Sequence, residues 1–201
     1  MKRRDWDGWW QAFARDSFER QSSWPVFERS KLNGKSVLDA GCGVLDGYVG
    51  QEMSPSFLLG ADYSDYGIKF ARQNKRAENF AICDIASLPF AGGSFDVVVS
   101  EAVLPHMAFS FESAVREIAR VSRESLFIST LHYEHYDFLD MERVETRYGK
   151  VFRSHYFGTD EYMMEELLAE CGFRTAEVKV SKVIEKGSFV KSGLFVEAIR
   201  K

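Results

Sequence analysis

The sequence has few of the residues that cross-link or interrupt a chain. Its 201 residues include three cysteines and four prolines. Cys42, Cys83 and Cys171 are odd in number, widely spaced and without a Cys-x-x-Cys pair. This pattern argues against a disulfide framework and against a structural zinc site. A reducing, cytoplasmic compartment is therefore the simplest expectation.

Long apolar runs and an excess of positive charge are missing as well. No stretch approaches the ~20 apolar residues of a membrane helix, and no apolar signal-peptide core follows Met1. We therefore expect neither membrane insertion nor export. The formal net charge is −4. A chain of this charge is poorly suited to holding a phosphate backbone over a wide surface, which disfavours a nucleic-acid partner.

What is present is the composition of an ordinary globular protein. Hydrophobic residues make up 45% of the chain and charged residues 28%, and this length can bury a substantial core. No internal repeat or low-complexity linker divides the sequence. We therefore predict a single domain over residues 1–201.

Short apolar runs alternate with helical patterns along most of the chain. The predicted strands are residues 36–39, 57–61, 80–83, 95–100 and 126–129, followed by 175–183 and 194–199. The predicted helices are residues 46–53, 64–76, 111–118 and 164–171. The last two strands have no helix between them, and a turn is expected at 186–188. This order predicts a Rossmann-like, doubly wound α/β fold with a seven-stranded, mostly parallel sheet and an antiparallel last strand.

Two segments stand outside this alternation. Residues 1–33 are expected to form a helical extension, in which Trp6, Trp9 and Trp10 share one face with Phe13. That face either packs on the body of the protein or forms an aromatic lid over a substrate cavity. Residues 137–156 are charged and aromatic, and we expect them to form a cap over the same site.

Acidic residues stand at the ends of the first four predicted strands. The first strand runs through Asp39 into a turn with Gly41 and Gly43, and the later acids are Asp62, Asp84 and Glu101. In open sheets of this kind, ligands bind at the carboxyl ends of the strands. An acid about 20 residues after the glycine turn suits ribose hydroxyls. Four acids together predict a negative crevice for a ligand with an ammonium and a sulfonium and no phosphate.

Two phosphate-binding alternatives fit the glycine turn poorly. In a dinucleotide fingerprint that begins at Gly41, the sixth position is Asp46, whose carboxylate would repel a pyrophosphate at the helix N-terminus. No Gly-Lys-Ser/Thr follows, which excludes a P-loop.

The motifs at these strand ends resemble those of a known family. Residues 37–107 resemble the core of the class I S-adenosylmethionine-dependent methyltransferases, in the type 11 branch that includes small-molecule and quinone-biosynthesis enzymes. Three segments carry the likeness: the glycine motif 37–43, the acid motif 59–64, and the block 84–90 with 94–100. A later stretch, 157–173, resembles the helix and Gly-Phe turn near the end of this branch.

The resemblance implies S-adenosylmethionine as the cofactor and a role for each matched position. The turn and the first acid would lie along the methionine part, Asp62 would bind the ribose and Tyr63 would lie beside the adenine. Asp84 and the Ile85 amide would meet the adenine edge. The end of the fourth strand would face the methionine end or the reacting methyl. The implied cofactor-binding residues are Asp39, Gly41, Cys42, Gly43, Asp62, Tyr63, Asp84, Ile85, Ser100 and Glu101.

One position departs from the family pattern. Where the family often has a further glycine, this chain has Leu45. A leucine adopts a positive φ only at a cost, so we expect a loop of different shape or one that lies closer to the methionine tail.

Histidines near the strand ends are the candidate catalytic bases, because histidine titrates near neutrality. His106 follows the fourth strand, and His132 and His135 follow the fifth. A structural role for His106 and a polar surface loop around His132 and His135 are the competing interpretations. The spacing of His132, Glu134, His135 and His155 fits no standard metal ligand set, so no metal is predicted.

Taken as a whole, the sequence predicts methyl transfer to a small-molecule acceptor by in-line displacement in a closed pocket. Aromatic segments mildly favour an aromatic or apolar acceptor. The alternatives are an RNA or protein methyltransferase and a non-catalytic module that binds S-adenosylmethionine.

Overall fold

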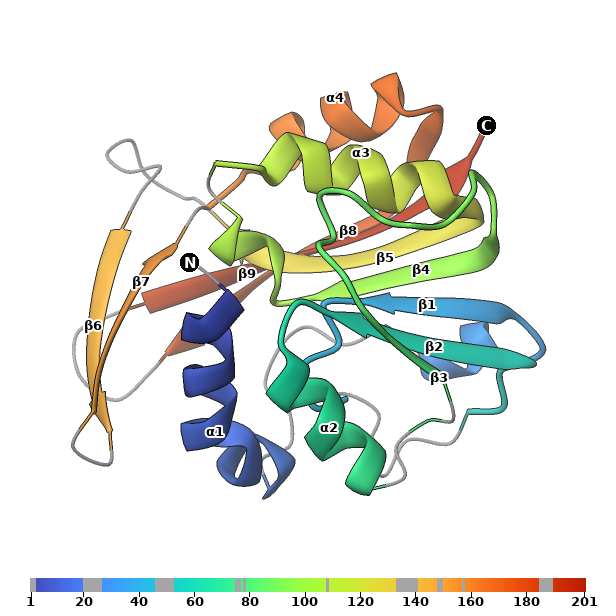
Figure 1. The fold of residues 1–201 in the computed structure, drawn as a ribbon. Helices are drawn as coiled ribbons and strands as arrows, with labels where there is room; N and C mark the ends of the chain where they lie inside the picture. Colours follow the sequence, from blue (N-terminus) through green and yellow to red (C-terminus); the bar gives the residue numbers. More distant parts are fainter. Residues whose placement is uncertain are drawn as a thin grey trace.

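A twisted seven-stranded sheet runs through the molecule in the computed structural model (Figure 1). The structure describes residues 3–19, 27–45, 53–74, 77, 79–107, 109–132, 141–147, 150–156, 158–184 and 190–201.

The strand order of the main sheet is β3-β2-β1-β4-β5-β9-β8. The five strands from β1 to β5 pair in parallel, β9 is antiparallel to β5, and β8 is antiparallel to β9. This confirms the predicted fold. The strands are β1 (Ser36–Ala40), β2 (Phe57–Asp62), β3 (Asn79–Ile82), β4 (Phe95–Glu101), β5 (Ser122–His132), β8 (Phe173–Ile184) and β9 (Val190–Arg200).

Helices cover both faces of this sheet, as the valine-rich central strands require. Helices α3 (Phe111–Val121) and α4 (Glu161–Glu170) lie on one face, and α2 (Asp65–Gln73) lies on the other (Figure 1). The buried side chains accordingly form two clusters, one on each face. Alternate residues of a strand supply them, with Val98 in one cluster and Val97 and Val99 in the other.

The helix boundaries follow ordinary capping rules. The Ser64 side chain accepts a hydrogen bond from Gly67 N at the start of α2, as the sequence predicted. Gly172 follows α4 with φ 83°, the left-handed conformation of a C-terminal glycine. Among the described residues, no helix has both the length and the apolar character that crossing a bilayer requires.

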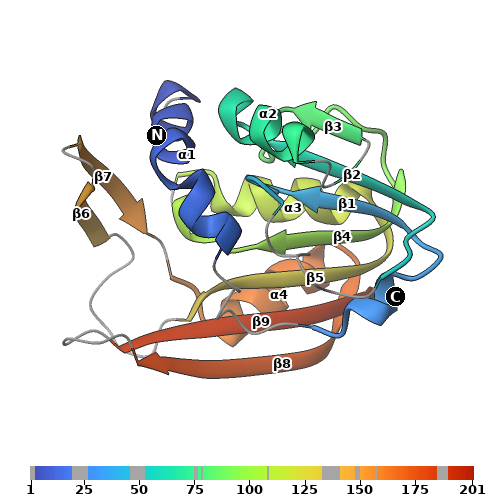
Figure 2. The same ribbon diagram turned by 90° about the horizontal axis from the view of Figure 1, so that it is seen from below.

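Most of the remaining elements lie near the carboxyl ends of the parallel strands, whereas the short turn that directly precedes β1 lies toward their amino ends. The remaining elements are α1 (Arg3–Glu19), the 3-10 turns η1 (Arg29–Leu32) and η3 (Leu104–His106), and a hairpin of β6 (Met141–Arg147) and β7 (Lys150–Tyr156). Figure 2 shows α1 between α2 and this hairpin. The sequence pattern did not predict the two strands within 137–156. Residues 46–52 of the predicted helix and the turn at 186–188 lie outside the described residues.

Candidate site at the carboxyl edge of the sheet

The sheet order brings most of the predicted site residues to one edge. Five neighbouring strands run parallel, so their carboxyl ends lie side by side in the order β3, β2, β1, β4, β5. Along that edge lie Asp84, Asp62, the turn after Asp39, Glu101 and finally His132. The edge therefore combines carboxylates, a backbone turn and an imidazole.

The glycine turn is built for close approach. Gly41 has φ 86° and Gly43 has φ 52°, and the amides of Gly41 and Cys42 both donate to Ala61 O, at 2.7 and 2.9 Å. A Cβ at Gly43 would lie 2.2 Å from Cζ2 of Trp10. The turn is thus fixed to β2 at one side and contacted by α1 at the other.

Leu45 stands at the position that departs from the family pattern. It adopts φ 57° although it is a leucine, with its amide donating to Cys42 O at 2.7 Å and its side chain 1% exposed. A left-handed L-residue costs about 1–2 kcal/mol. The leucyl side chain is buried in the α2-side cluster, which is the cluster of buried residues that contains Val97 and Val99, and this burial offsets the cost.

Asp62 is the best-defined carboxylate of the edge. Its Oδ2 accepts from Gly43 N at 2.8 Å and its Oδ1 accepts from Ser64 N at 2.7 Å. Burial raises the pKa of Asp62 to about 6, against the opposing effect of these amides. The amide of Tyr63 also interacts with this carboxylate. Since a carboxylate has about four acceptor positions, part of its acceptor capacity is left for the hydroxyls of a ligand.

The positions predicted to surround an adenine differ in exposure. Tyr63 is 39% exposed after β2, and Asp84 is exposed with Oδ1 accepting from Ala86 N at 2.9 Å. Ile85 is buried.

The Cys42 side chain packs in the α2-side cluster, and burial raises the pKa of its thiol. Cys42 can therefore offer a ligand its backbone only.

Glu101 has a partner that the sequence analysis missed. Arg29 of η1 is 4% exposed, and its Nη2 lies 2.6 Å from Oε2 of Glu101, with the guanidinium over the Phe27 ring. Burial raises the pKa of Glu101, and the nearby guanidinium opposes that rise. The edge is therefore less negative than four unpaired acids would make it. A lone arginine outside any motif gave no signal in the sequence.

Buried hydroxyls also mark the ends of β4 and β5. Ser100 Oγ, Ser129 Oγ and Thr130 Oγ1 have no hydrogen-bond partner among the described residues. A buried polar atom in this state is unusual, and a ligand with polar groups would satisfy it.

The three candidate histidines have different surroundings. His106 packs edge-on against Trp6, with ring centroids 4.9 Å apart. Nε2 of His132 lies 2.9 Å from Oε2 of Glu161, the first residue of α4. His135 and Glu134 lie outside the described residues, as does Tyr133.

Helix α1 contacts this edge at three points. Besides the contacts of Trp6 with His106 and of Trp10 with Gly43, Oδ1 of Asp7 accepts from Ser64 Oγ at 2.7 Å and from Tyr66 N at 3.0 Å. Trp6 and Trp10 of the predicted aromatic face therefore pack near the strand ends. Neither Arg29 nor the capping role of Asp7 was foreseen from sequence.

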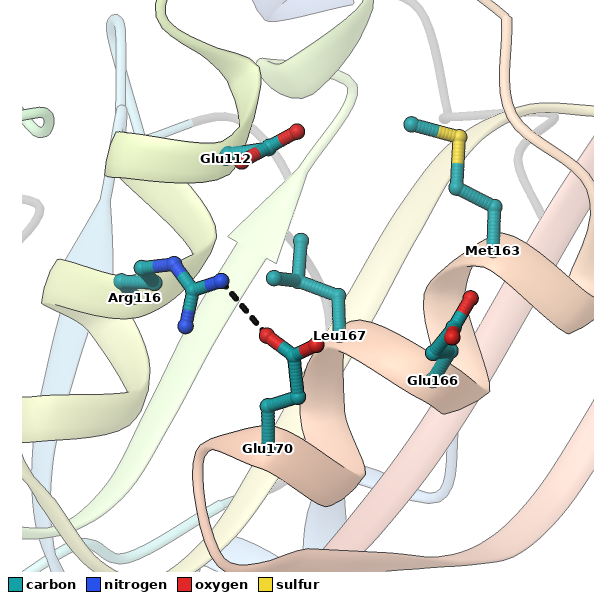
Figure 3. Close-up of a pocket in the computed structure, with 6 residues that line it drawn as sticks. All are labelled: Glu112, Arg116, Met163, Glu166, Leu167 and Glu170. Carbon is teal, nitrogen blue, oxygen red and sulfur yellow. Dashed lines mark hydrogen bonds and ion pairs between the residues drawn. The ribbon is translucent and has the colours of Figure 1, made fainter.

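A separate groove lies between α3 and α4 (Figure 3), with a volume of about 140 Å³. Its lining residues are Glu112, Arg116, Met163, Glu166, Leu167 and Glu170. Arg116 and Glu170 form an ion pair of 2.6 Å across it. None of the predicted site residues lines this groove.

Residues 38–127 match a family described as methyltransferase domain. The chain is 34% identical over 108 residues to a malonyl-[acyl-carrier protein] O-methyltransferase of Erwinia pyrifoliae, a match that covers 52% of this chain and 40% of the relative. It is 32% identical over 119 residues to a tRNA (carboxymethyluridine(34)-5-O)-methyltransferase of Arabidopsis thaliana, covering 56% of this chain and 28% of that one. The chain thus spans less than half the length of these curated relatives.

A solved structure matches over nearly the whole fold. The magnesium protoporphyrin IX methyltransferase of Synechocystis PCC 6803 with bound SAM superposes with a TM-score of 0.65 at 18% identity. The match covers 98% of this chain and 97% of the other. At this identity the likeness establishes the shared fold.

Proposed function

Since residues 38–127 make this chain a class I S-adenosylmethionine-dependent methyltransferase of the type 11 kind, we propose that the protein transfers the methyl group of S-adenosylmethionine to a small-molecule acceptor. The observation that carries the proposal is the joint geometry of Asp62 and the glycine turn. Asp62 is anchored by Gly43 N and Ser64 N at the sheet edge, where a carboxylate suits the hydroxyls of a ribose.

The residues of the edge fit this cofactor. Asp62 suits the ribose hydroxyls, and the Gly41–Gly43 backbone allows a close approach of the methionine part. Tyr63, Asp84 and Ile85 are the proposed adenine contacts, and Ser100 carries a buried hydroxyl that an ammonium group would satisfy. When bound, the cofactor supplies a methyl group that its sulfonium already activates.

The protein's own contribution is then positioning, exclusion of water and proton transfer. Holding the acceptor in line with the methyl carbon supplies much of the rate in such displacements. A hydroxyl or ammonium acceptor must also lose a proton. His106, His132 and His135 stay the candidate bases. His132, at the end of β5, has the best-defined surroundings.

We also propose that α1 acts as a lid over the cofactor site. Trp10 lies on Gly43, where the methionine part is expected, so ligand binding should change the surroundings of this indole. The test is tryptophan fluorescence during titration with S-adenosylhomocysteine. The signal change should disappear in Trp10→Phe and persist in Trp9→Phe, a matched change on the same helix. A signal that survives in Trp10→Phe would oppose a lid at this position.

Calorimetric titration with S-adenosylmethionine and S-adenosylhomocysteine tests the proposed function. We expect binding that Asp62→Ala weakens at least tenfold. Asp65→Ala is the matched control. Asp65 follows Asp62 by three residues and forms an ion pair with Lys69 on the surface of α2. A well-folded wild type that binds neither compound would exclude the enzyme function.

RNA is the second candidate acceptor. A tRNA methyltransferase stands among the relatives at nearly the identity of the malonyl-carrier-protein enzyme. The net charge of −4 favours the small molecule.

A further inference from the structure

One face of β4 and β5 ends in buried polar side chains. Ser100, Thr130 and His132 share this face, because Ser100 is in register with Ile128 and side chains alternate along a strand. Within the described part of the chain, nothing forms a hydrogen bond to Ser100 Oγ, Thr130 Oγ1 or Nδ1 of His132. The desolvation of such atoms is costly, so polar groups of bound ligands would be stabilised along this face. His132 lies four residues beyond the register partner of Ser100, so an acceptor hydroxyl at His132 is separate from the ammonium group proposed at Ser100.

The other ring nitrogen of His132 is fixed by a carboxylate. Its Nε2 lies 2.9 Å from Oε2 of Glu161, and the His132 side chain is 8% exposed. The backbone amide of Glu161 and the contact with His132 lower the pKa of Glu161, so this carboxylate is ionised at neutral pH and can only accept. In the neutral imidazole, Nε2 must therefore carry the proton, which leaves the lone pair on Nδ1.

The backbone holds the two residues together. Thr159 N donates to Leu131 O at 3.1 Å, so the segment that leads into α4 continues the sheet beside the end of β5. The turn η3, which carries His106 and follows β4, packs against β5. The family match ends at residue 127, so neither His132 nor Glu161 comes from it.

We propose that His132 is the general base of the methyl transfer, that Glu161 is its positioning residue, and that the acceptor atom is a hydroxyl oxygen. This inference rests on the proposed function. Both relatives described above are named as O-methyltransferases, which agrees with an oxygen acceptor. Malonyl and carboxymethyl groups carry carboxylates that are already ionised at neutral pH, so a base at this position would distinguish a hydroxyl acceptor from acceptors of that kind. A carboxylate that orients an imidazole for proton abstraction is an arrangement found on several unrelated folds.

The proposed step balances in atoms and electrons. The acceptor O–H bond breaks and its proton passes to Nδ1 of His132. The oxygen forms a bond to the methyl carbon, and the electron pair of the broken carbon–sulfur bond stays on sulfur. The carboxylate of Glu161 stabilises the imidazolium that results, and the proton then leaves to solvent.

Nitrogen-15 NMR of the histidine side chains tests the tautomer without any acceptor. At a pH where the His132 ring is neutral, we expect its proton on Nε2 in the wild type. In Glu161→Gln the amide can donate to Nε2, so the Nδ1-protonated form should become populated. Glu165→Gln, an exposed change one turn further along α4, should leave the wild-type signal unchanged. A wild-type His132 protonated on Nδ1 would overturn the proposal.

Turnover with a hydroxyl probe tests the base itself. With labelled S-adenosylmethionine and catechol, His132→Ala should lower kcat about 10²–10⁴-fold, with an unchanged KM for the cofactor. Added imidazole should restore part of that rate, which a purely structural role of His132 would not allow. A kcat within threefold of wild type in His132→Ala, or a wild type that methylates benzylamine and not catechol, would overturn the proposal.

Calorimetry with S-adenosylhomocysteine distinguishes a failure of this inference from a failure of the proposed function on which it rests. Wild type, His132→Ala and Glu161→Gln should bind the compound equally. Loss of binding in all three would remove the proposed function itself. Equal binding together with an unchanged kcat in the variants would exclude His132 as the general base and leave the proposed function in place.

Discussion

At the scale of single residues, Leu45 combines a costly backbone conformation with a buried side chain. Leucine-to-alanine changes in a core cost about 2–5 kcal/mol, and glycine is ordinarily about 0.4–1 kcal/mol worse than alanine. Residue 45 has φ 57°, a conformation that glycine adopts without a steric cost. The usual order of stability, in which alanine is better than glycine, should therefore be reversed here. We expect Leu45→Gly to be at least as stable as Leu45→Ala in urea unfolding.

Leu38 provides the control, because it is fully buried in β1 and is absent from the positive-φ positions of the described chain. There the alanine variant should be the more stable of the two. The same order at Leu45 would mean that the leucine does not hold the left-handed conformation in solution.

Asp62 predicts a distinctive dependence of stability on pH. Burial raises its pKa to about 6 from an ordinary value of 3.8, so the folded state binds more protons than the unfolded state between these values. Its contribution to stability is present below pH 3.8 and is lost as the pH rises through 6. Relative to Asp62→Asn, the wild type should therefore lose about 2–3 kcal/mol between pH 4 and pH 7.5.

Asp96 should show the opposite trend and serves as the comparison. The Ser36 amide holds the pKa of Asp96 at about 2, below the ordinary value of 3.8. The stability it contributes is present above pH 3.8 and is lost as the pH falls through 2. If the free energy of unfolding, measured by chemical denaturation relative to the wild type, changed with pH in the same direction for Asp62→Asn and Asp96→Asn, the raised pKa of Asp62 would be contradicted.

At the scale of elements, Asp7 joins α1 to the start of α2. Asp7→Ala removes the acceptor for Ser64 Oγ and Tyr66 N, whereas the Ser64 cap of Gly67 N remains. Loss of a capping interaction costs about 0.5–2 kcal/mol. We expect faster hydrogen exchange in α1 and in the first turn of α2, measured by mass spectrometry.

Two further variants sharpen this measurement. Asp7→Asn keeps an oxygen acceptor and should show a smaller effect, and Asp5→Ala changes an exposed carboxylate of the same helix. Exchange that rises equally in Asp5→Ala and Asp7→Ala would mean that charge on α1, rather than the contact with α2, holds the helix in place.

The main elements could be predicted from the sequence because their signals are local. The valine run of β4, the Ser64 cap and the glycine after α4 each depend on neighbouring residues. The hairpin of β6 and β7 was missed, because its strands carry charged residues without an apolar alternation. The place of Asp62 at the carboxyl edge of the sheet could be predicted, because it ends a strand shortly after the glycine turn. The contacts of Arg29 with Glu101 and of Asp7 with Ser64 join residues 72 and 57 positions apart, and no local pattern reports such pairs.

At the scale of the whole molecule, the charge of the chain separates the two acceptor classes. Proteins that hold RNA without sequence preference do so through phosphate contacts, with Kd typically about 10⁻⁴–10⁻⁶ M at physiological salt. The net charge of −4 gives this chain little of that attraction. The basic surface of an RNA enzyme is therefore not expected here.

We expect mixed tRNA to bind more weakly than about 10⁻⁵ M at 150 mM salt in a fluorescence anisotropy titration, with little change at lower salt. Tight binding that weakens steeply with salt would favour RNA as the acceptor, since it would reveal a local basic surface that the net charge conceals. The hydroxyl proposed to lose its proton to His132 would then belong to a nucleotide, and the assignment of Glu161 and His132 would stand unchanged. Weak, salt-independent binding would leave a small hydroxylated molecule as the acceptor.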